Sequence, residues 1–156
     1  MGRLADKNIL ITGGNSGIGL AAAQEFYREG ARVAICGLNE RTLQAAKGTL
    51  GAGSLAVRAD VSNLTDLDTM FATIKREFGH LDGIFVNAGY SEFLLFEEVT
   101  EQSFDKVIAV NFTMSNLASQ GARLESNGVI KMHGLQTYQD ISRRALNWTK
   151  KPTTGW

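Results

Sequence analysis

A glycine-rich turn near the amino terminus carries the most evident chemistry in this sequence. Gly13, Gly17 and Gly19 follow an apolar run at residues 9–11 and precede a helical pattern. Because glycine has no Cβ, the backbone of such a turn can approach a bulky anion, and the free N–H groups at the start of the helix face it. A dinucleotide pyrophosphate suits this geometry. Glycine turns that bind nothing also join strands to helices, so the turn alone leaves both interpretations open.

Three more short segments follow strand-like apolar runs. Residues 37–39 come after the run 32–36, Asp60 and Val61 after 55–59, and residues 87–89 after 84–86. Because the carboxyl ends of parallel strands lie at one edge of a sheet, these segments are expected to meet the glycine turn there. Taken singly, each has a structural interpretation: Asp60 suits a cap at a strand end, and residues 87–89 suit an ordinary turn.

Strand and helix patterns alternate along the chain. The first helix has Ile18, Ala21, Ala22 and Phe26 at helical spacing, which predicts a buried face. Later helices are expected to begin after residue 39, after 62 or 63, and after 100, where capping residues stand. The pattern predicts an α/β fold with a Rossmann-like, doubly wound parallel sheet in three α/β/α layers. Strands two and three should lie on one side of strand one, and strand four on the other.

Composition limits the class of protein. The chain has 156 residues, enough for one domain over 1–156, and its 16 basic and 16 acidic residues balance. This balance gives no indication of a nucleic-acid or membrane surface. Cys36, the single cysteine, stands in an apolar strand and is interpreted as a buried structural thiol, while His80 and His133 have no grouping that suggests a metal site. No signal-peptide core or membrane span is evident, so a cytoplasmic protein is expected.

The motifs together resemble the short-chain dehydrogenase/reductase family. Thr12 to Gly19 reads TGGNSGIG, which matches the family's TGxxxGIG motif, and Asp60 with Val61 and the NAG triplet at 87–89 match two further motifs. Asn111 stands where the family keeps an asparagine that orders a proton-relay water. The resemblance covers residues 7–111. It implies hydride transfer between a nicotinamide cofactor and a carbonyl or alcohol, with a cofactor site made by Gly13, Asn15, Ser16, Gly17, Ile18, Gly19, Leu38, Asp60, Val61, Asn87, Ala88 and Gly89.

The end of strand two bears on the choice between NAD and NADP. An NAD site usually has an acid there, which holds the ribose hydroxyls. Here no acid occurs before Glu40, and Leu38 stands where NADP-binding members of the family often have arginine. Weak discrimination with a slight preference for NADP is expected.

After Asn111 the sequence departs from the family pattern. Catalysis in the family needs a serine after strand five and a tyrosine followed four residues later by lysine. Residues 127–134 could form that strand, but no serine ends it, and Tyr138 is followed at the fourth position by Ser142. Tyr138 is therefore interpreted either as a core residue or as a catalytic acid. Residues 112–149 are predicted to complete the domain in an atypical way, and 150–156 to form a tail.

Three functions remain open from the sequence. The chain is an NAD(P)-dependent oxidoreductase with an altered acid/base group, a nucleotide-binding domain without turnover, or an assembly protein with a vestigial site. Residues 7–111 favour the first two, and residues 112–156 favour the second over the first, so an oxidoreductase-family cofactor-binding domain with doubtful turnover is expected. A domain truncated relative to the family is expected, whether by natural truncation, frame shift, splicing or engineering. Association into a homo-oligomer, most simply a dimer, is expected through the carboxyl-terminal half, because uncovered strand edges and apolar helix faces favour self-association.

Overall fold

The structure, a computed structural model, describes residues 2–113. Four parallel strands form one sheet in the order β3-β2-β1-β4, as the sequence predicts. The elements are β1 (Asn8–Thr12), α1 (Gly17–Arg28), β2 (Arg32–Gly37), α2 (Glu40–Gly48), β3 (Leu55–Arg58), α3 (Leu64–Phe78), β4 (Gly83–Phe85), the 3-10 turn η1 (Phe96–Glu98), α4 (Glu101–Ile108) and the π-helical turn η2 (Ala109–Thr113).

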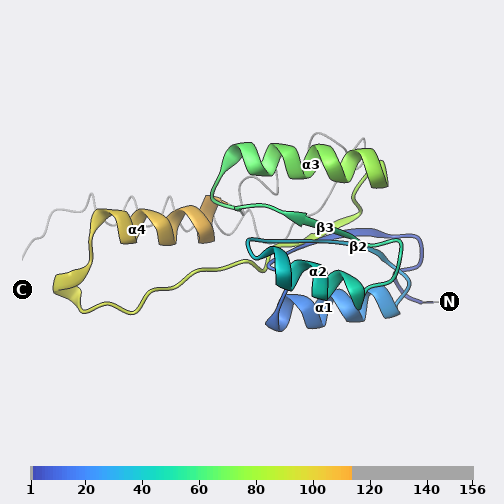
Figure 1. Cartoon of the computed structure of the whole chain (residues 1–156), viewed down its shortest axis with the longest axis horizontal. Helices are drawn as coiled ribbons and strands as arrows, with labels where there is room; N and C mark the ends of the chain where they lie inside the picture. Colours follow the sequence, from blue (N-terminus) through green and yellow to red (C-terminus); the bar gives the residue numbers. More distant parts are fainter. Residues whose placement is uncertain (1, 114–156) are drawn as a thin grey trace, which may run out of the picture.

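Helices cover both faces of the sheet. Helices α1 and α2 lie on one face and α3 on the other (Figure 1). Strand β1 shows why: Leu10 packs in a cluster with residues of α3, whereas Ile9 and Ile11 pack in a second cluster with residues of α1 and α2. Successive strand residues point to opposite faces, so an unbroken apolar strand fills both layers. This confirms the predicted parallel α/β fold.

Local capping fixes where the helices start. Asn39 accepts a hydrogen bond from the N–H of Thr42, Asn63 accepts from Thr65 and Asp66, and Thr100 accepts from Ser103. All three predicted starts are therefore confirmed, with Asn63 the cap of α3. The strand and helix ends leave short turns at the carboxyl edge of the sheet, where the chemistry-bearing segments lie.

The predicted buried face of α1 is wrong in part. Ile18 is 76% exposed and Ala21 is also exposed, whereas Gly19 and Ala23 are the buried residues of the helix. The reason is the close approach of Gly19 to the turn before it, which turns this side of the helix inward. The spacing of apolar side chains does not predict that a glycine will be the buried residue of a helix.

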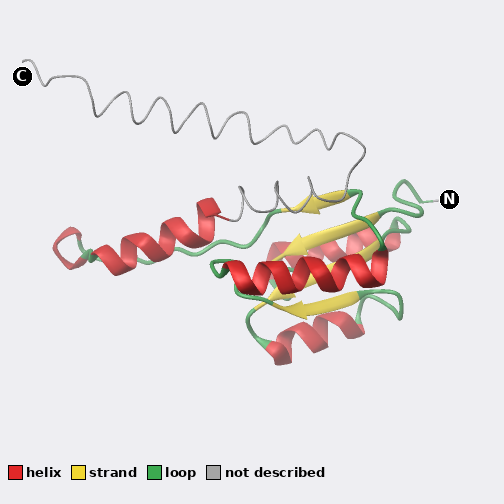
Figure 2. Cartoon of the chain, turned by 90° about the horizontal axis from the view of Figure 1, so that it is seen from above, coloured by secondary structure: helices red, strands yellow, loops and turns green. Residues whose placement is uncertain are grey.

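Residues after β4 leave the body of the fold. The chain runs through a loop and η1 into α4, which lies beyond the carboxyl edge of the sheet (Figure 2). We call residues 90–108 the arm. It exposes large apolar side chains, with Phe93 97%, Phe96 90% and Phe104 59% accessible. Among the described helices, none is long and apolar enough to cross a bilayer.

The described residues do not include the possible strand at 127–134, the rest of the predicted completion from 114 to 149, or the tail 150–156. The division of 1–156 into a family-like part and an atypical completion therefore stays a prediction.

Asp82 joins the amino ends of β1 and β4. Its carboxylate accepts the N–H of Asn8 at 2.8 Å and the ammonium of Lys7 at 3.0 Å, and His80 Nε2 lies 3.3 Å away. Partial burial raises the pKa of Asp82, but the Asn8 N–H, Lys7 and His80 together lower it, and the net pKa lies below the usual value. The folded state therefore favours the ionised carboxylate, and Asp82 stabilises the sheet where β4 joins it.

We predict that Asp82→Asn lowers the free energy of unfolding at pH 7 by about 1.5 kcal/mol, because a charged acceptor of two hydrogen bonds is lost. Since the folded pKa is depressed, this stabilisation is complete above the unfolded pKa of about 3.9 and disappears as the pH falls through the folded pKa. Urea unfolding of both proteins at pH 7 and pH 3 measures the difference. Asp68→Asn, at an exposed position of α3, is the control, and an equal gap at both pH values would contradict the assignment.

Candidate functional site

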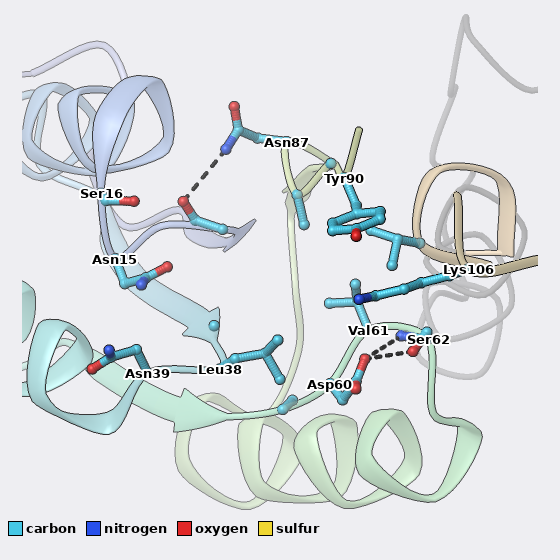
Figure 3. Close-up of a pocket in the computed structure, with 16 residues that line it drawn as sticks. Asn15, Ser16, Leu38, Asn39, Asp60, Val61, Ser62, Asn87, Tyr90 and Lys106 are labelled. Atoms are coloured by element: carbon cyan, nitrogen blue, oxygen red, sulfur yellow. Dashed lines mark hydrogen bonds between the residues drawn. The ribbon is translucent and has the colours of Figure 1, made fainter. Parts of the chain in front are cut away.

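A cavity of about 490 Å³ opens at the carboxyl edge of the sheet. This volume lies within the range of small-molecule sites. Figure 3 shows side chains from the β1–α1 turn, the ends of β2 and β3, the segment after β4, and α4 surrounding it. The lining residues are Gly13, Asn15, Ser16, Gly37, Leu38, Asn39, Ala59, Asp60, Val61, Ser62, Asn87, Ala88, Gly89, Tyr90, Lys106 and Val110.

Thr12 and Asn87 connect the carboxyl ends of β1 and β4 at this edge. The buried hydroxyl of Thr12 accepts the N–H groups of Asn87 and Ala88, both at 3.0 Å. In return the Asn87 side-chain amide donates to the carbonyl of Thr12 at 3.2 Å and to that of Gly13 at 3.4 Å. The glycine turn is thus held in place by residues 75 positions later in the chain.

Two glycines of the turn have no room for a side chain. Gly13 has φ +65°, in the left-handed region, and a Cβ on Gly19 would lie 2.2 Å from the carbonyl oxygen of Gly13 and 2.6 Å from the Asn87 amide nitrogen. The first turn of α1 therefore sits directly against the turn that precedes it. Any larger residue at position 19 must displace the backbone that borders the cavity.

The amino terminus of α1 is left open. Ser16 occupies the cap position without a side-chain hydrogen bond, and the first turn of α1 has no acidic residue. The helices α2, α3 and α4 differ, because each has a side-chain cap and an acid in its first turn. An uncapped helix start leaves N–H donors and the positive end of the helix dipole available to an anion. Ser16 lines the cavity, so these donors are presented at its wall.

Asp60 has a local partner and also borders the cavity. Its Oδ1 accepts the N–H of Ser62 at 2.9 Å and the Ser62 hydroxyl at 2.6 Å, while its own N–H donates to Asp66. The structural interpretation of Asp60 as a cap at a strand end is therefore correct. It does not exclude a ligand contact, because each carboxylate oxygen has further acceptor capacity.

Asn111 joins the segment after β4 to η2. Its side-chain amide accepts the N–H of Tyr90 at 3.1 Å and donates to the Tyr90 carbonyl at 2.7 Å. Asn111 lies in the π-helical turn η2, a local geometry that often occurs at functional sites. A Cβ on Gly89 would lie 3.2 Å from Asn111 Oδ1, so this glycine makes room for the contact. Asn111 itself is not among the lining residues, and its expected role with a relay water stays a prediction.

Tyr90 and Lys106 are the two residues of the arm that line the cavity. The Lys106 ammonium lies 4.3 Å from the centre of the Tyr90 ring, within the range of a cation–π contact. Asp60 and Lys106 are the charged side chains among the lining residues, so the wall carries one charge of each sign.

Nine of the predicted cofactor residues line the cavity. They are Gly13, Asn15, Ser16, Leu38, Asp60, Val61, Asn87, Ala88 and Gly89. Gly17, Ile18 and Gly19 lie beside it in the first turn of α1, and Tyr138 lies outside the described residues. The structure adds Gly37, Asn39, Ala59, Ser62 and Tyr90, all next to a predicted residue in sequence. It also adds Lys106 and Val110, which no sequence signal indicated.

Cys36 lies under the turn and is fully buried, as expected for a structural thiol. Burial raises its pKa to about 12, although an N–H of Gly13 partly opposes the shift. The thiolate needed for a nucleophile is therefore absent at neutral pH.

Comparisons with known proteins place these features in one family. The short chain dehydrogenase family profile matches residues 7–127, beyond Asn111, where the motif resemblance ended. Oxidoreductase asL5 of Sarocladium schorii is 40% identical over 120 residues, which cover 77% of this chain and 48% of that protein. A short chain dehydrogenase of Claviceps purpurea is 33% identical over 147 residues, covering 90% of this chain and 55% of the relative.

A solved structure has the same fold. The 3-ketoacyl-(acyl-carrier-protein) reductase of Brucella melitensis, complexed with NADH, superposes with a TM-score of 0.75 at 31% identity, covering 78% of this chain and 51% of that one. This chain thus spans about half the length of the relatives it matches. The parallel sheet, the glycine turn against Asn87 and the extent of the family match lead to one conclusion: the chain belongs to the short-chain dehydrogenase family.

Proposed function

We propose that this chain is the nicotinamide dinucleotide-binding part of an oxidoreductase of the short-chain dehydrogenase type. The observation that carries the proposal is the open start of α1, which has neither cap nor acid and borders a cavity at the switch between β1 and β4. In open parallel sheets, ligands bind at this place. The Brucella melitensis relative complexed with NADH supports the choice of ligand class.

The residues present fit such a cofactor. The backbone of Gly13 to Gly19 would hold the pyrophosphate, because glycines and free N–H groups meet there. Leu38 and Val61 would contact the adenine side, where Asp60 offers a carboxylate acceptor. Asn87, Ala88 and Gly89 would support the remaining part of the cofactor. The bound cofactor would supply the hydride, and these residues would position it and exclude water from its surroundings.

We propose weak discrimination between NAD and NADP, with a slight preference for NADP. Glu40, the first acid after β2, accepts a hydrogen bond from Gln44 at 2.8 Å and is not among the residues that line the cavity. No carboxylate from the end of β2 therefore lines the cavity to repel a 2′-phosphate, and no lining arginine would attract it.

Hydride transfer between the cofactor and a carbonyl or alcohol is the reaction proposed for the family-type protein. For this chain alone we propose very slow turnover or none, because its sequence has no tyrosine followed four residues later by lysine.

The second candidate function is that of a non-catalytic assembly protein with a vestigial site. The exposed apolar side chains of the arm favour it, because such patches mark protein interfaces. We further propose a cytoplasmic location and a homodimer.

We predict that Gly19→Val abolishes dinucleotide binding, because its side chain would displace the Gly13 carbonyl and the Asn87 amide.

Ser16→Asp is the sharper variant: aspartate is a good cap and should preserve α1, but its carboxylate would repel a pyrophosphate. Calorimetry with NADH should show at least about tenfold weaker binding for Ser16→Asp, with an unchanged melting temperature. Gly48→Ala is the control, since a Cβ there meets no atom within 4 Å. Unchanged affinity in folded Ser16→Asp would contradict the site.

We predict that turnover of a ketone or secondary alcohol by this chain is slow or undetectable. A proton donor that works near neutral pH needs a tuned pKa, whereas an unassisted tyrosine has a pKa of about 10. Tyr138→Phe should therefore change the rate little in an assay that follows NADPH absorbance. Robust turnover that collapses in Tyr138→Phe would restore Tyr138 as the catalytic acid.

We predict concentration-dependent self-association at micromolar concentration, measured by light scattering. The exposed side chains of Phe93 and Phe96 on the arm gain burial by association. Phe93→Ser with Phe96→Ser should shift the mass toward that of a monomer. Leu64→Ser, at an exposed apolar residue on α3, should not. A constant monomer mass of the unmodified chain would exclude the dimer.

A further inference from the structure

The arm, residues 90–108, carries a groove of its own. The loop of the arm runs outward from the sheet, and α4 returns beside it (Figures 1 and 2). Between them lies a cavity of about 160 Å³, lined by Glu92, Leu94, Val99, Ser103, Phe104 and Val107. It shares no lining residue with the cavity at the edge of the sheet, so the groove is a separate surface from the candidate dinucleotide site.

The groove is apolar and is not covered by any of residues 2–113. Among its lining side chains, Leu94 is 39%, Val99 50% and Phe104 59% accessible. Every residue from 91 to 102 is exposed. An apolar cavity of similar volume holds a ring the size of benzene, so the groove has room for one aromatic side chain. Apolar surface of this kind is stabilised when another surface covers it.

The arm is also acidic. It contains five acids and a single base, Lys106, which give it a net charge of −4. All five acids are exposed: Glu92, Glu97, Glu98, Glu101 and Asp105. A covering surface that combines apolar side chains with positive charge would therefore complement both properties of the arm.

The rest of the sequence contains one segment with these properties. Residues 1–89 carry nine bases and nine acids, whereas residues 114–156 carry six bases and two acids, a net charge of +4. We call residues 137–151, which lie outside the described residues, the basic segment. Its sequence has apolar side chains at helical spacing, namely Tyr138, Ile141, Ala145 and Trp148. Its bases are Arg143, Arg144, Lys150 and Lys151.

The chain between the arm and the basic segment is long enough to join them. Residues 114–136 span up to roughly 75 Å when extended, whereas α4 is only about 12 Å long. A segment of the same chain also has an effective concentration on the order of millimolar, which a second copy at micromolar concentration does not reach. These lengths and concentrations favour the segment of the same chain over that of a second copy.

We propose that the basic segment covers the groove of the arm within the same chain. Trp148 occupies the cavity between the loop and α4, and the bases on either side of it face the acids of the arm. The two charged parts of this otherwise balanced chain thereby neutralise one another. Phe93 and Phe96 do not line the groove, so the self-association proposed through them is a separate contact.

Tryptophan fluorescence of the full chain tests the position of Trp148. The two tryptophans are Trp148 and Trp156, so Trp156→Phe leaves one reporter. Its emission should lie at shorter wavelength than that of the same chain unfolded in urea, because the indole leaves water. Phe104→Ser should move the emission toward the unfolded value, whereas Leu64→Ser, at an exposed apolar residue on α3, should not. Emission at the unfolded value, or emission that Phe104→Ser does not change, would contradict the proposal.

Disulfide formation identifies which chain supplies the basic segment. Cys36 is buried with a pKa raised to about 12, so it does not interfere at neutral pH. Ser103→Cys with Trp148→Cys should form an intrachain disulfide, which keeps the monomer mass on a non-reducing gel. Asp68→Cys with Trp148→Cys, at an exposed position of α3, is the control and should form at least about tenfold less. A disulfide that doubles the mass would assign the segment to a second copy and overturn the proposal.

Charge reversal tests the pairing of the two charged parts. Glu92→Lys with Glu97→Lys should lower the yield of the intrachain disulfide at least about threefold, because like charges then face one another. Arg144→Glu with Lys151→Glu should lower it similarly, and the two pairs combined should restore it. At about 1 M salt, where charges are screened, either pair alone should have little effect. A yield that stays low in the combined variant would show that charge does not select the basic segment.

Discussion

The buried hydroxyl of Thr12 is the contact on which the candidate site depends. Thr12 is the last residue of β1, and its hydroxyl accepts hydrogen bonds from two backbone N–H groups of the segment after β4. The Asn87 side-chain amide in turn donates to the carbonyls of Thr12 and Gly13. Buried backbone groups at a strand end are costly unless they are paired. Here the pairing also fixes the glycine turn, because the amide that satisfies the Gly13 carbonyl is the one that Gly19 must avoid. One polar cluster therefore satisfies two strand ends and shapes the cavity wall.

The sequence was sufficient to predict the framework because each part has a local signal. Apolar runs predicted the strands, and the capping residues Asn39, Asn63 and Thr100 predicted where the helices start. The alternation of strands with helices predicted the parallel strand order. The glycine turn and the segments after β3 and β4 then had to meet at one edge. What predicted the site was therefore the rule that carboxyl ends of parallel strands converge, applied to residues that stand directly after strands.

Other parts of the site had no such signal. Lys106 and Val110 reach the cavity because Asn111 fastens η2 to the backbone of Tyr90, and this contact joins residues 21 positions apart through an irregular loop. The hydrogen bond that Asn15 Nδ2 donates to Thr42 Oγ1 at 2.8 Å likewise depends on the packing of the glycine turn against the start of α2. Periodicity predicts which face of an element is buried, but not which polar side chains meet between elements. The same limit explains Ile18, whose apolar side chain was expected inside and lies outside.

The position of β1 at the centre of the sheet has a consequence for the order of assembly. Its pairing with β2 closes a short stretch of chain, whereas its pairing with β4 joins residues about 75 positions apart through only three registered pairs. Loop closure costs more entropy for the longer segment, so β4 is expected to join a preformed β1–α1–β2 unit late and to detach from it early. Hydrogen exchange should then be faster at Asn87 and Ala88 than at the centre of β2. Residues that follow β4 line the cavity, so a ligand that bridges the ends of β1 and β4 would stabilise the attachment of β4, which is expected to join last among the four described strands.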